Sequence, residues 1–180
     1  MSDNIVWIVD LDASPEEAPA LGERVTAWLV AEGIVSSATG SAPGAGHLLG
    51  RGPSAAAMDT FPLMEPVAMC GLEVMAERRV FHTGDNGIDS IRCPECGASH
   101  DPDELPWTDA AGSWLEGAAD DGMTCPDCGA HPGIAAWEFD LPWGFGNLAF
   151  GFWNWPVSEG LATGISAFTG HRYRVVHEHL

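Results

Sequence analysis

The spacing of apolar residues predicts a strand followed by a helix at the start of the chain. The apolar run IVWIV within residues 5–10 is typical of a buried strand. Ser14 is followed by Pro and, three residues on, by Glu17, which is typical of a helix start. The pattern predicts a helix over 15–32 that ends at Gly33, with an apolar face formed by Leu21, Val25, Trp28 and Leu29.

The spacing of apolar residues after residue 70 predicts further strands and another helix. Imperfect alternation over 72–81 and regular alternation over 147–155 both indicate strands. Helical spacing over 158–170 predicts a short helix, and residues 173–177 are typical of a closing strand. We also expect a short additional strand over 136–141.

This order of elements predicts an α+β fold, and more narrowly a ferredoxin-like βαββαβ sandwich with an insertion. Residues 1–84 and 131–180 would together form one α+β domain, and residues 85–130 an inserted module. Residues 36–57 are rich in Ser, Ala, Gly and Pro and predict an irregular loop. Its Gly44-Ala45-Gly46 stretch lacks the Lys-Ser/Thr of a phosphate-binding loop, so we do not expect an ATPase.

The predicted module is distinguished by its acidity and its cysteines. Residues 85–130 contain eleven Asp and Glu but one Arg. They also contain two C-P-x-C-G motifs, 93–97 and 125–129, with 28 residues between the last Cys of one and the first Cys of the other. Two thiolates separated by two residues converge on one ion, and the Gly lets backbone N–H groups approach the sulfurs. We therefore expect one tetrahedral site with the ligands Cys93, Cys96, Cys125 and Cys128.

The motifs resemble two families of metal-binding modules, and the resemblance covers residues 85–130 only. The paired C-P-x-C-G motifs are similar to those of zinc ribbons, which hold structural zinc. The stretch 120–130 (DDGMTCPDCGA) is similar to the second motif of rubredoxin, which holds iron for one-electron transfer. Either resemblance implies the same four ligands. Rubredoxin has aromatic residues beside its first motif. Here Ile91 and Arg92 precede Cys93, and Trp107 and Trp114 could take the aromatic role, but their spacing is not that of the family.

Proline in both motifs favours Zn²⁺ as the cofactor, with Fe as the alternative. A closed shell of four cysteines leaves no position for water, so the ion is expected to be structural. We expect the acidic module to have little core of its own and to depend on the ion for folding.

The net charge of −19, with seven Arg and no Lys, argues against several classes of partner. A broad basic surface, needed for nucleic acid or anionic membranes, is absent from this composition. No apolar run approaches the ~18 residues of a membrane-spanning helix. The first residues do not resemble a secretory signal, so we expect a cytoplasmic protein.

These observations favour a protein-binding or adaptor protein, in one version an inhibitor or immunity-type protein that matches a basic partner. Trp153 and Trp155 are two apart in a predicted strand, so we expect them to share a face and take them as candidate partner-binding residues. One alternative is a rubredoxin-like iron electron-transfer protein. Another is an enzyme with an unidentified non-metal active site, although no nucleophile–base motif favours it. The sequence leaves the oligomeric state open.

The remaining polar residues match no known catalytic or metal-binding motif. His177 and His179 share a face of the last strand, which leaves a second metal site open. A pocket that joined Asp10, His82 or His177 to other titratable groups would favour an enzyme. The lone Cys70 is expected to be a small buried hydrophobe. Two further histidines are expected at the surface or beside the metal ligands: His100 and His131.

Overall fold

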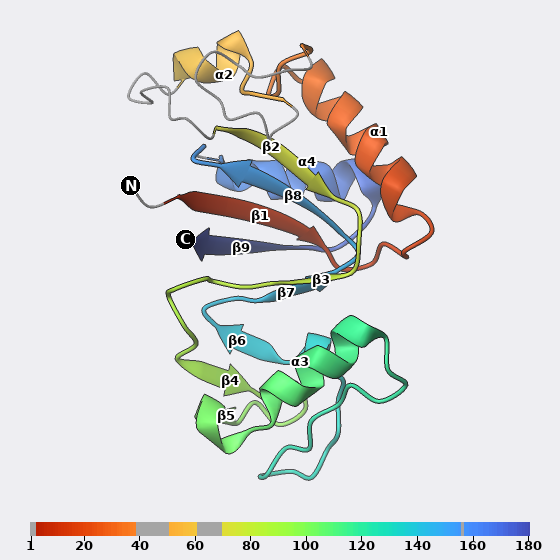
Figure 1. The fold of residues 1–180 in the computed structure, drawn as a ribbon, viewed down its shortest axis with the longest axis vertical. Helices are drawn as coiled ribbons and strands as arrows, with labels where there is room; N and C mark the ends of the chain where they lie inside the picture. Colours follow the sequence, from red (N-terminus) through yellow and green to blue (C-terminus); the bar gives the residue numbers. More distant parts are fainter. Residues whose placement is uncertain (1–2, 39–50, 61–69, 156) are drawn as a thin grey trace.

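The structure is a computed structural model that describes residues 3–38, 51–60, 70–155 and 157–180. These residues form a mixed α/β molecule with antiparallel sheets and few helices (Figure 1). The strands are β1 (Asn4–Asp10), β2 (Gly71–Met75), β3 (Arg79–Phe81), β4 (Ser90–Arg92), β5 (Ser99–His100), β6 (Glu138–Asp140), β7 (Gly144–Gly146), β8 (Leu148–Trp153) and β9 (Tyr173–His179). The helices are α1 (Ala18–Ala31), α2 (Ala55–Thr60), α3 (Trp107–Glu116) and α4 (Glu159–Thr169), with 3₁₀ turns η1 (Pro102–Glu104) and η2 (Ile134–Ala136).

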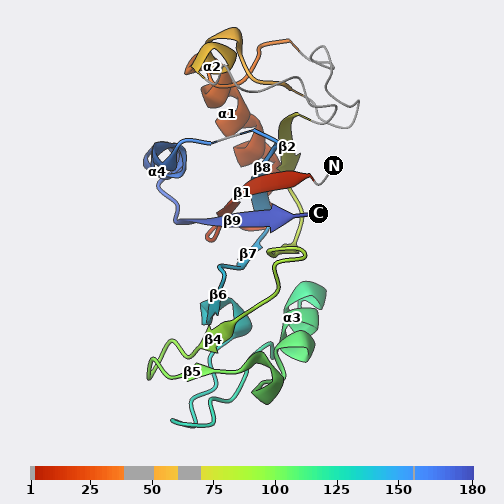
Figure 2. The same cartoon turned by 90° about the vertical axis from the view of Figure 1, so that its left-hand side faces the viewer.

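The main sheet has the strand order β2-β8-β1-β9, and all of its neighbouring strands are antiparallel. Helices α1 and α4 lie together on one side of this sheet (Figure 2). The start of α1 follows the sequence expectation in part: the Ser14 hydroxyl accepts a hydrogen bond from the Glu17 backbone N–H (3.2 Å), and the regular helix begins at Ala18.

Both faces of the central strands β1 and β8 are buried. Successive residues point to opposite sides, so each of these strands contributes side chains to two hydrophobic clusters. The paired residues Ile8 and Phe150 belong to the cluster beneath the helices. On the other face, Trp7 lies opposite Gly151 and contacts the ring of Phe81 from β3, with 4.9 Å between ring centroids. The Trp7 indole N–H also donates to the buried carboxylate of Glu178 (2.6 Å). This hydrogen bond joins β1 to β9 among apolar side chains.

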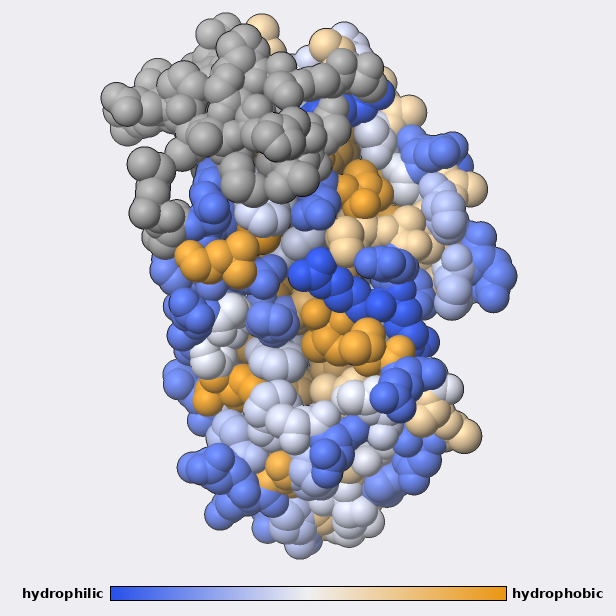
Figure 3. Space-filling model, in the orientation of Figure 1, coloured by the Kyte–Doolittle hydropathy of each residue, from blue (hydrophilic) through white to orange (hydrophobic). Residues whose placement is uncertain are grey.

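The segment between β2 and β8 leaves the main sheet through β3 and returns through β7, which pair with each other (Figure 1). Beyond them lie a small sheet of order β5-β4-β6 and helix α3. Hydrophilic and intermediate side chains cover most of this lower part of the molecule on the face drawn in Figure 3.

The expectation that this segment has little core is wrong. It has a hydrophobic cluster of its own, which also includes Cys93 and Cys125 and continues past residue 130 to Phe145. Trp137 and Phe139 lie in the short strand expected over 136–141, but the large members within 85–130 are spread among polar residues and show no periodic pattern. The large members of the whole cluster include Ile91, Trp114, Met123, Ile134, Trp137 and Phe139.

Other expectations differ from the structure in detail. The strand expected over 72–81 is two strands, β2 in the main sheet and β3 in the connection, because the chain leaves the sheet after Met75. Helix α3 was not expected. The loop expected over 36–57 is described only in part: α2 begins at Ala55, and Gly44-Ala45-Gly46 lies outside the described residues. Within the described residues, no helix has both the length and the apolar character needed to cross a membrane.

Candidate metal centre

The four paired cysteines converge within the segment between β2 and β8. Their sulfur atoms all lie within 4.8 Å of one another. The distance is 3.9 Å from Cys93 Sγ to Cys128 Sγ and 3.7 Å from Cys96 Sγ to Cys125 Sγ. A tetrahedron with metal–sulfur bonds of about 2.3 Å has edges of about 3.8 Å. The cluster therefore suggests a bound metal ion, and the expectation that the two motifs meet is confirmed.

The two motifs fold in the same way. Gly97 and Gly129 both have a left-handed backbone, with φ of 74° and 72°. In the first motif the Gly97 N–H donates to the Cys93 carbonyl (3.0 Å), and the Cys93 N–H donates to the Ala98 carbonyl (2.9 Å). The second motif repeats both bonds, Gly129 to Cys125 at 2.9 Å and Cys125 to Ala130 at 2.8 Å. The repeated C-P-x-C-G sequence thus gives two matching turns that present their sulfurs to each other.

Backbone N–H groups stabilise negative charge on the sulfurs. The Cys96 sulfur accepts a hydrogen bond from the Ala98 N–H, and the Cys128 sulfur accepts one from the Ala130 N–H. Four thiolates around a divalent ion leave a charge of about −2, which such donors offset. The pKa values of the Cys96 and Cys128 thiols are nevertheless raised, because desolvation and the neighbouring cysteines outweigh these donors.

Cys125 accepts hydrogen bonds from both backbone and side-chain donors. Burial opposes its ionisation, but hydrogen bonds from the Cys128 and Asp127 N–H groups and from His100 outweigh burial and lower the pKa of this thiol to about 6. His100 Nε2 lies 3.5 Å from Cys125 Sγ, and the imidazole is itself buried. His100 thus lies beside a candidate ligand. Its position in the sequence predicted either this location or the surface.

The cluster has a buried side and an exposed side. Cys93 and Cys125 lie in the hydrophobic cluster of the segment, whereas Cys96 and Cys128 are exposed. Trp107 and Trp114 belong to the same apolar cluster as the buried pair. The candidate ion would therefore lie between a packed core and solvent.

The expectation that Trp153 and Trp155 share a strand face is wrong. Strand β8 ends at Trp153, and Asn154 then adopts a positive φ of 48°, which ends the alternation. Trp153 lies against the cluster around Trp7 and donates its indole N–H to Glu73 (2.7 Å). Trp155 is buried in the cluster on the opposite face of the sheet.

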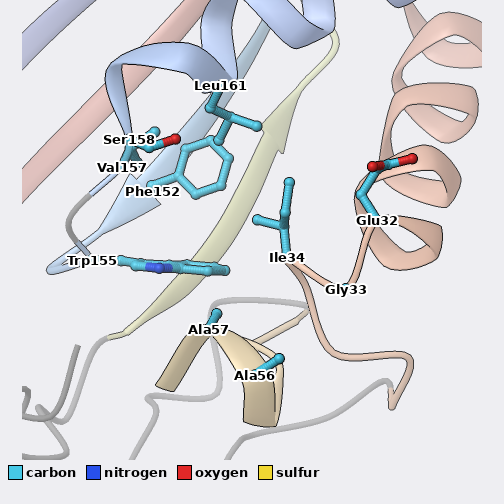
Figure 4. A pocket seen from close by; sticks show the side chains of 10 residues that line it. All are labelled: Glu32, Gly33, Ile34, Ala56, Ala57, Phe152, Trp155, Val157, Ser158 and Leu161. Carbon is cyan, nitrogen blue, oxygen red and sulfur yellow. The ribbon is translucent and has the colours of Figure 1, made fainter. Parts of the chain in front are cut away.

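Trp155 also lines a cavity of about 340 Å³ between the end of α1, α2 and the start of α4 (Figure 4). Ile34, Phe152 and Leu161 point into the same space (Figure 4). Its lining is mostly apolar, with Glu32 and Ser158 as the polar side chains. The role of the two tryptophans in binding a partner stays a prediction.

Asp10 has a histidine partner that the sequence did not reveal. Its fully buried carboxylate accepts the backbone N–H groups of Asp12 (2.9 Å) and Ala13 (2.8 Å), and His171 Nδ1 lies 2.9 Å away. The other ring nitrogen of His171 lies 3.6 Å from Glu17. Because Asp10 and His171 are far apart in sequence, only the pairing of β1 with β9 brings them together. The group links the loops at one end of the main sheet.

The other histidines that the structure describes do not join Asp10. The ring of His82 accepts the Gly84 N–H (3.0 Å), His177 is exposed, and His179 Nδ1 contacts Asn4 Oδ1 (2.9 Å). His131 lies between Thr124 and Asp120 at the surface. Within the described ranges, the four cysteines are the one set of His, Cys, Asp or Glu side chains close enough to share an ion.

Comparison of the chain with protein-family models, curated proteins and solved structures gave no match in any of the three.

Proposed function

We propose that this chain is a zinc protein in which the ion has a structural role. The observation that carries the proposal is the convergence of Cys93, Cys96, Cys125 and Cys128 from two matching turns. Four thiolates fill a tetrahedral shell, so an ion held by all four has no position for substrate or water. Such an ion would join two turns whose sequences lie far apart, and its binding energy would stabilise the inserted segment.

Iron is the alternative occupant, and one observation favours it: Cys96 and Cys128 are exposed residues. An exposed edge suits transfer of an electron to or from a partner. Protein isolated from a medium that contains both metals distinguishes the two. A colourless protein with one zinc per chain supports the structural role, and a red protein that bleaches with a reductant supports electron transfer.

We also propose that the main sheet is a ferredoxin-like βαββαβ unit and that the metal-binding segment is inserted in it. The order β2-β8-β1-β9, with α1 after β1 and α4 before β9, supports this assignment. The insertion lies between β2 and β8, which are adjacent in the sheet and would otherwise form a hairpin.

The acidic surface of the inserted segment supports a second part of the proposal, the docking of a basic protein. All but Asp121 of the eleven acidic residues in 85–130 are exposed. Two basic side chains of the region contact acids, Arg92 with Glu138 and His131 with Asp120. A surface of one sign favours a partner of the opposite sign and increases its rate of association.

Charge reversal at the two motifs tests the docking proposal. Glu95 and Asp127 are exposed at equivalent positions of the two turns. We expect the E95K/D127K variant to lose salt-sensitive binding to a panel of small basic proteins. The matched control is E16K/E23K, which makes the same change in charge at exposed positions before and on α1. Equal loss in both variants, or no salt-sensitive binding by the wild type, would contradict specific docking.

A further inference from the structure

The two cysteine motifs are nearly equivalent, but one side chain breaks the equivalence. The fourth residue after Cys96 is His100, whereas the fourth residue after Cys128 is Pro132, which has no side-chain donor. His100 reaches from the first motif to Cys125, the first cysteine of the second motif. The histidine that follows the second motif, His131, bonds to Thr124 and Asp120 and not to a sulfur.

His100 is held in place by its surroundings. It lies on β5, where its backbone pairs with Ile91 of β4. Its imidazole is 6% exposed and meets the ring of Trp137 edge-on, with 6.3 Å between centroids. Nε2 lies 3.5 Å from Cys125 Sγ. A buried ring held between a strand and an aromatic side chain has little freedom to point elsewhere.

We propose that His100 is a positioning residue that donates an Nε2–H hydrogen bond to the metal-bound thiolate of Cys125. A metal-bound thiolate has no proton to donate, so the ring nitrogen beside it must be the donor. The bond fixes the orientation of the sulfur and withdraws part of its negative charge, as groups around metal ligands do. This inference rests on the proposed metal site and adds a specific residue to it.

Cobalt(II) provides the test, because its sulfur-to-metal charge-transfer absorption reports on the charge of the thiolates. The H100F variant keeps a ring against Trp137 but removes the donor. The H100Q variant keeps an N–H donor. The control is H131F, since His131 also follows a cysteine motif but bonds to Thr124 and Asp120 instead of a sulfur.

We expect the absorption of H100F to move to longer wavelength, because a thiolate without the hydrogen bond gives up an electron more easily. H100Q should restore most of the wild-type position, and H131F should match the wild type. Zinc affinity, measured by competition with a chelator, should fall about tenfold in H100F. Circular dichroism of each variant confirms that it is folded.

The outcomes separate this inference from the proposal on which it rests. If the wild type binds cobalt with four-thiolate absorption but H100F has an unchanged spectrum, the role of His100 is wrong and the metal site stands. If H100F and H100Q shift equally, the histidine has only a packing role and the inference is again wrong. If the wild type binds neither cobalt nor zinc, both the metal site and the inference are wrong.

Discussion

Gly97 and Gly129 show how single residues shape the candidate metal centre. Each follows the second cysteine of its motif and has a left-handed backbone, with φ of 74° and 72°. A Cβ at either position would meet no described atom within 4 Å. The glycines are thus needed for backbone conformation and not for space.

We predict that G97A and G129A each destabilise the protein by about 1–2 kcal/mol, the cost of a left-handed conformation for an L-residue with a side chain. The two values should be similar because the two turns match. Denaturant unfolding of the metal-loaded protein measures them. A change near zero at both positions would contradict the strained-backbone explanation.

At this scale the sequence predicted the cluster of four cysteines, and it left open which side chains lie beside them. The spacing of Cys93, Cys96, Cys125 and Cys128 sufficed, because each pair is local and a metal site needs both pairs. His100 acts across the two motifs, and His171 meets Asp10 across the main sheet. Such pairings depend on tertiary structure, which no local pattern contains.

Helix α3 illustrates what sequence patterns miss at the scale of elements. It has ten residues and contains Gly112, a poor helix former, at an exposed position. Its buried residues are Ala110 and Trp114, too few for a clear apolar stripe. Strands β1 and β8 and helix α1 were predictable because long apolar runs or repeated spacing extend through them.

We predict that G112A stabilises the protein by about 1 kcal/mol, because alanine favours the helix and a Cβ there meets no atom within 4 Å. The matched control is G151A in β8. Its Cβ would lie 2.5 Å from a carbon of the Trp7 ring, so we expect a loss of about 1–3 kcal/mol. Denaturant unfolding compares the two. A destabilising G112A would contradict the assignment of α3.

The loop after β1 and the start of β9 are joined by an ion pair that predicts a pH effect. Arg172 donates to Asp12 from its backbone N–H (2.7 Å) and its Nε (3.1 Å). These bonds hold the pKa of the Asp12 carboxyl below its ordinary value. Because the folded-state pKa is the lower one, the stabilisation is present above the unfolded pKa and disappears as the pH falls through the folded pKa.

We predict that R172Q lowers Tm by about 1–3 °C at pH 7, given that exposed pairs contribute roughly 0.2–1 kcal/mol. The difference from wild type should disappear at a pH below the pKa of Asp12. R24Q is the control, since Arg24 lies over the ring of Phe168 rather than beside a carboxylate. A difference for R172Q that persists unchanged in acid would contradict the assignment.

At the scale of the whole molecule, a four-stranded sheet with two helices is connected through β3 and β7 to a segment that contains the cysteine cluster. Contacts across the connection include Phe81 on Trp7, and Arg78 over the ring of Trp114 at 3.9 Å. The order of the main strands and helices along the chain was predictable from the periodic segments. The core of the segment between β2 and β8 was not, because its apolar residues within 85–130 are spread among acids.

The metal content of the untagged protein, measured with and without a chelator, tests the central claim most directly. The account predicts one zinc per chain, four cysteine thiols protected from alkylation while the ion is bound, and a fall in Tm of the inserted segment when the chelator removes it. A protein that contains no metal after purification and refolding with zinc, with all four thiols reactive and an unchanged Tm, would contradict the account.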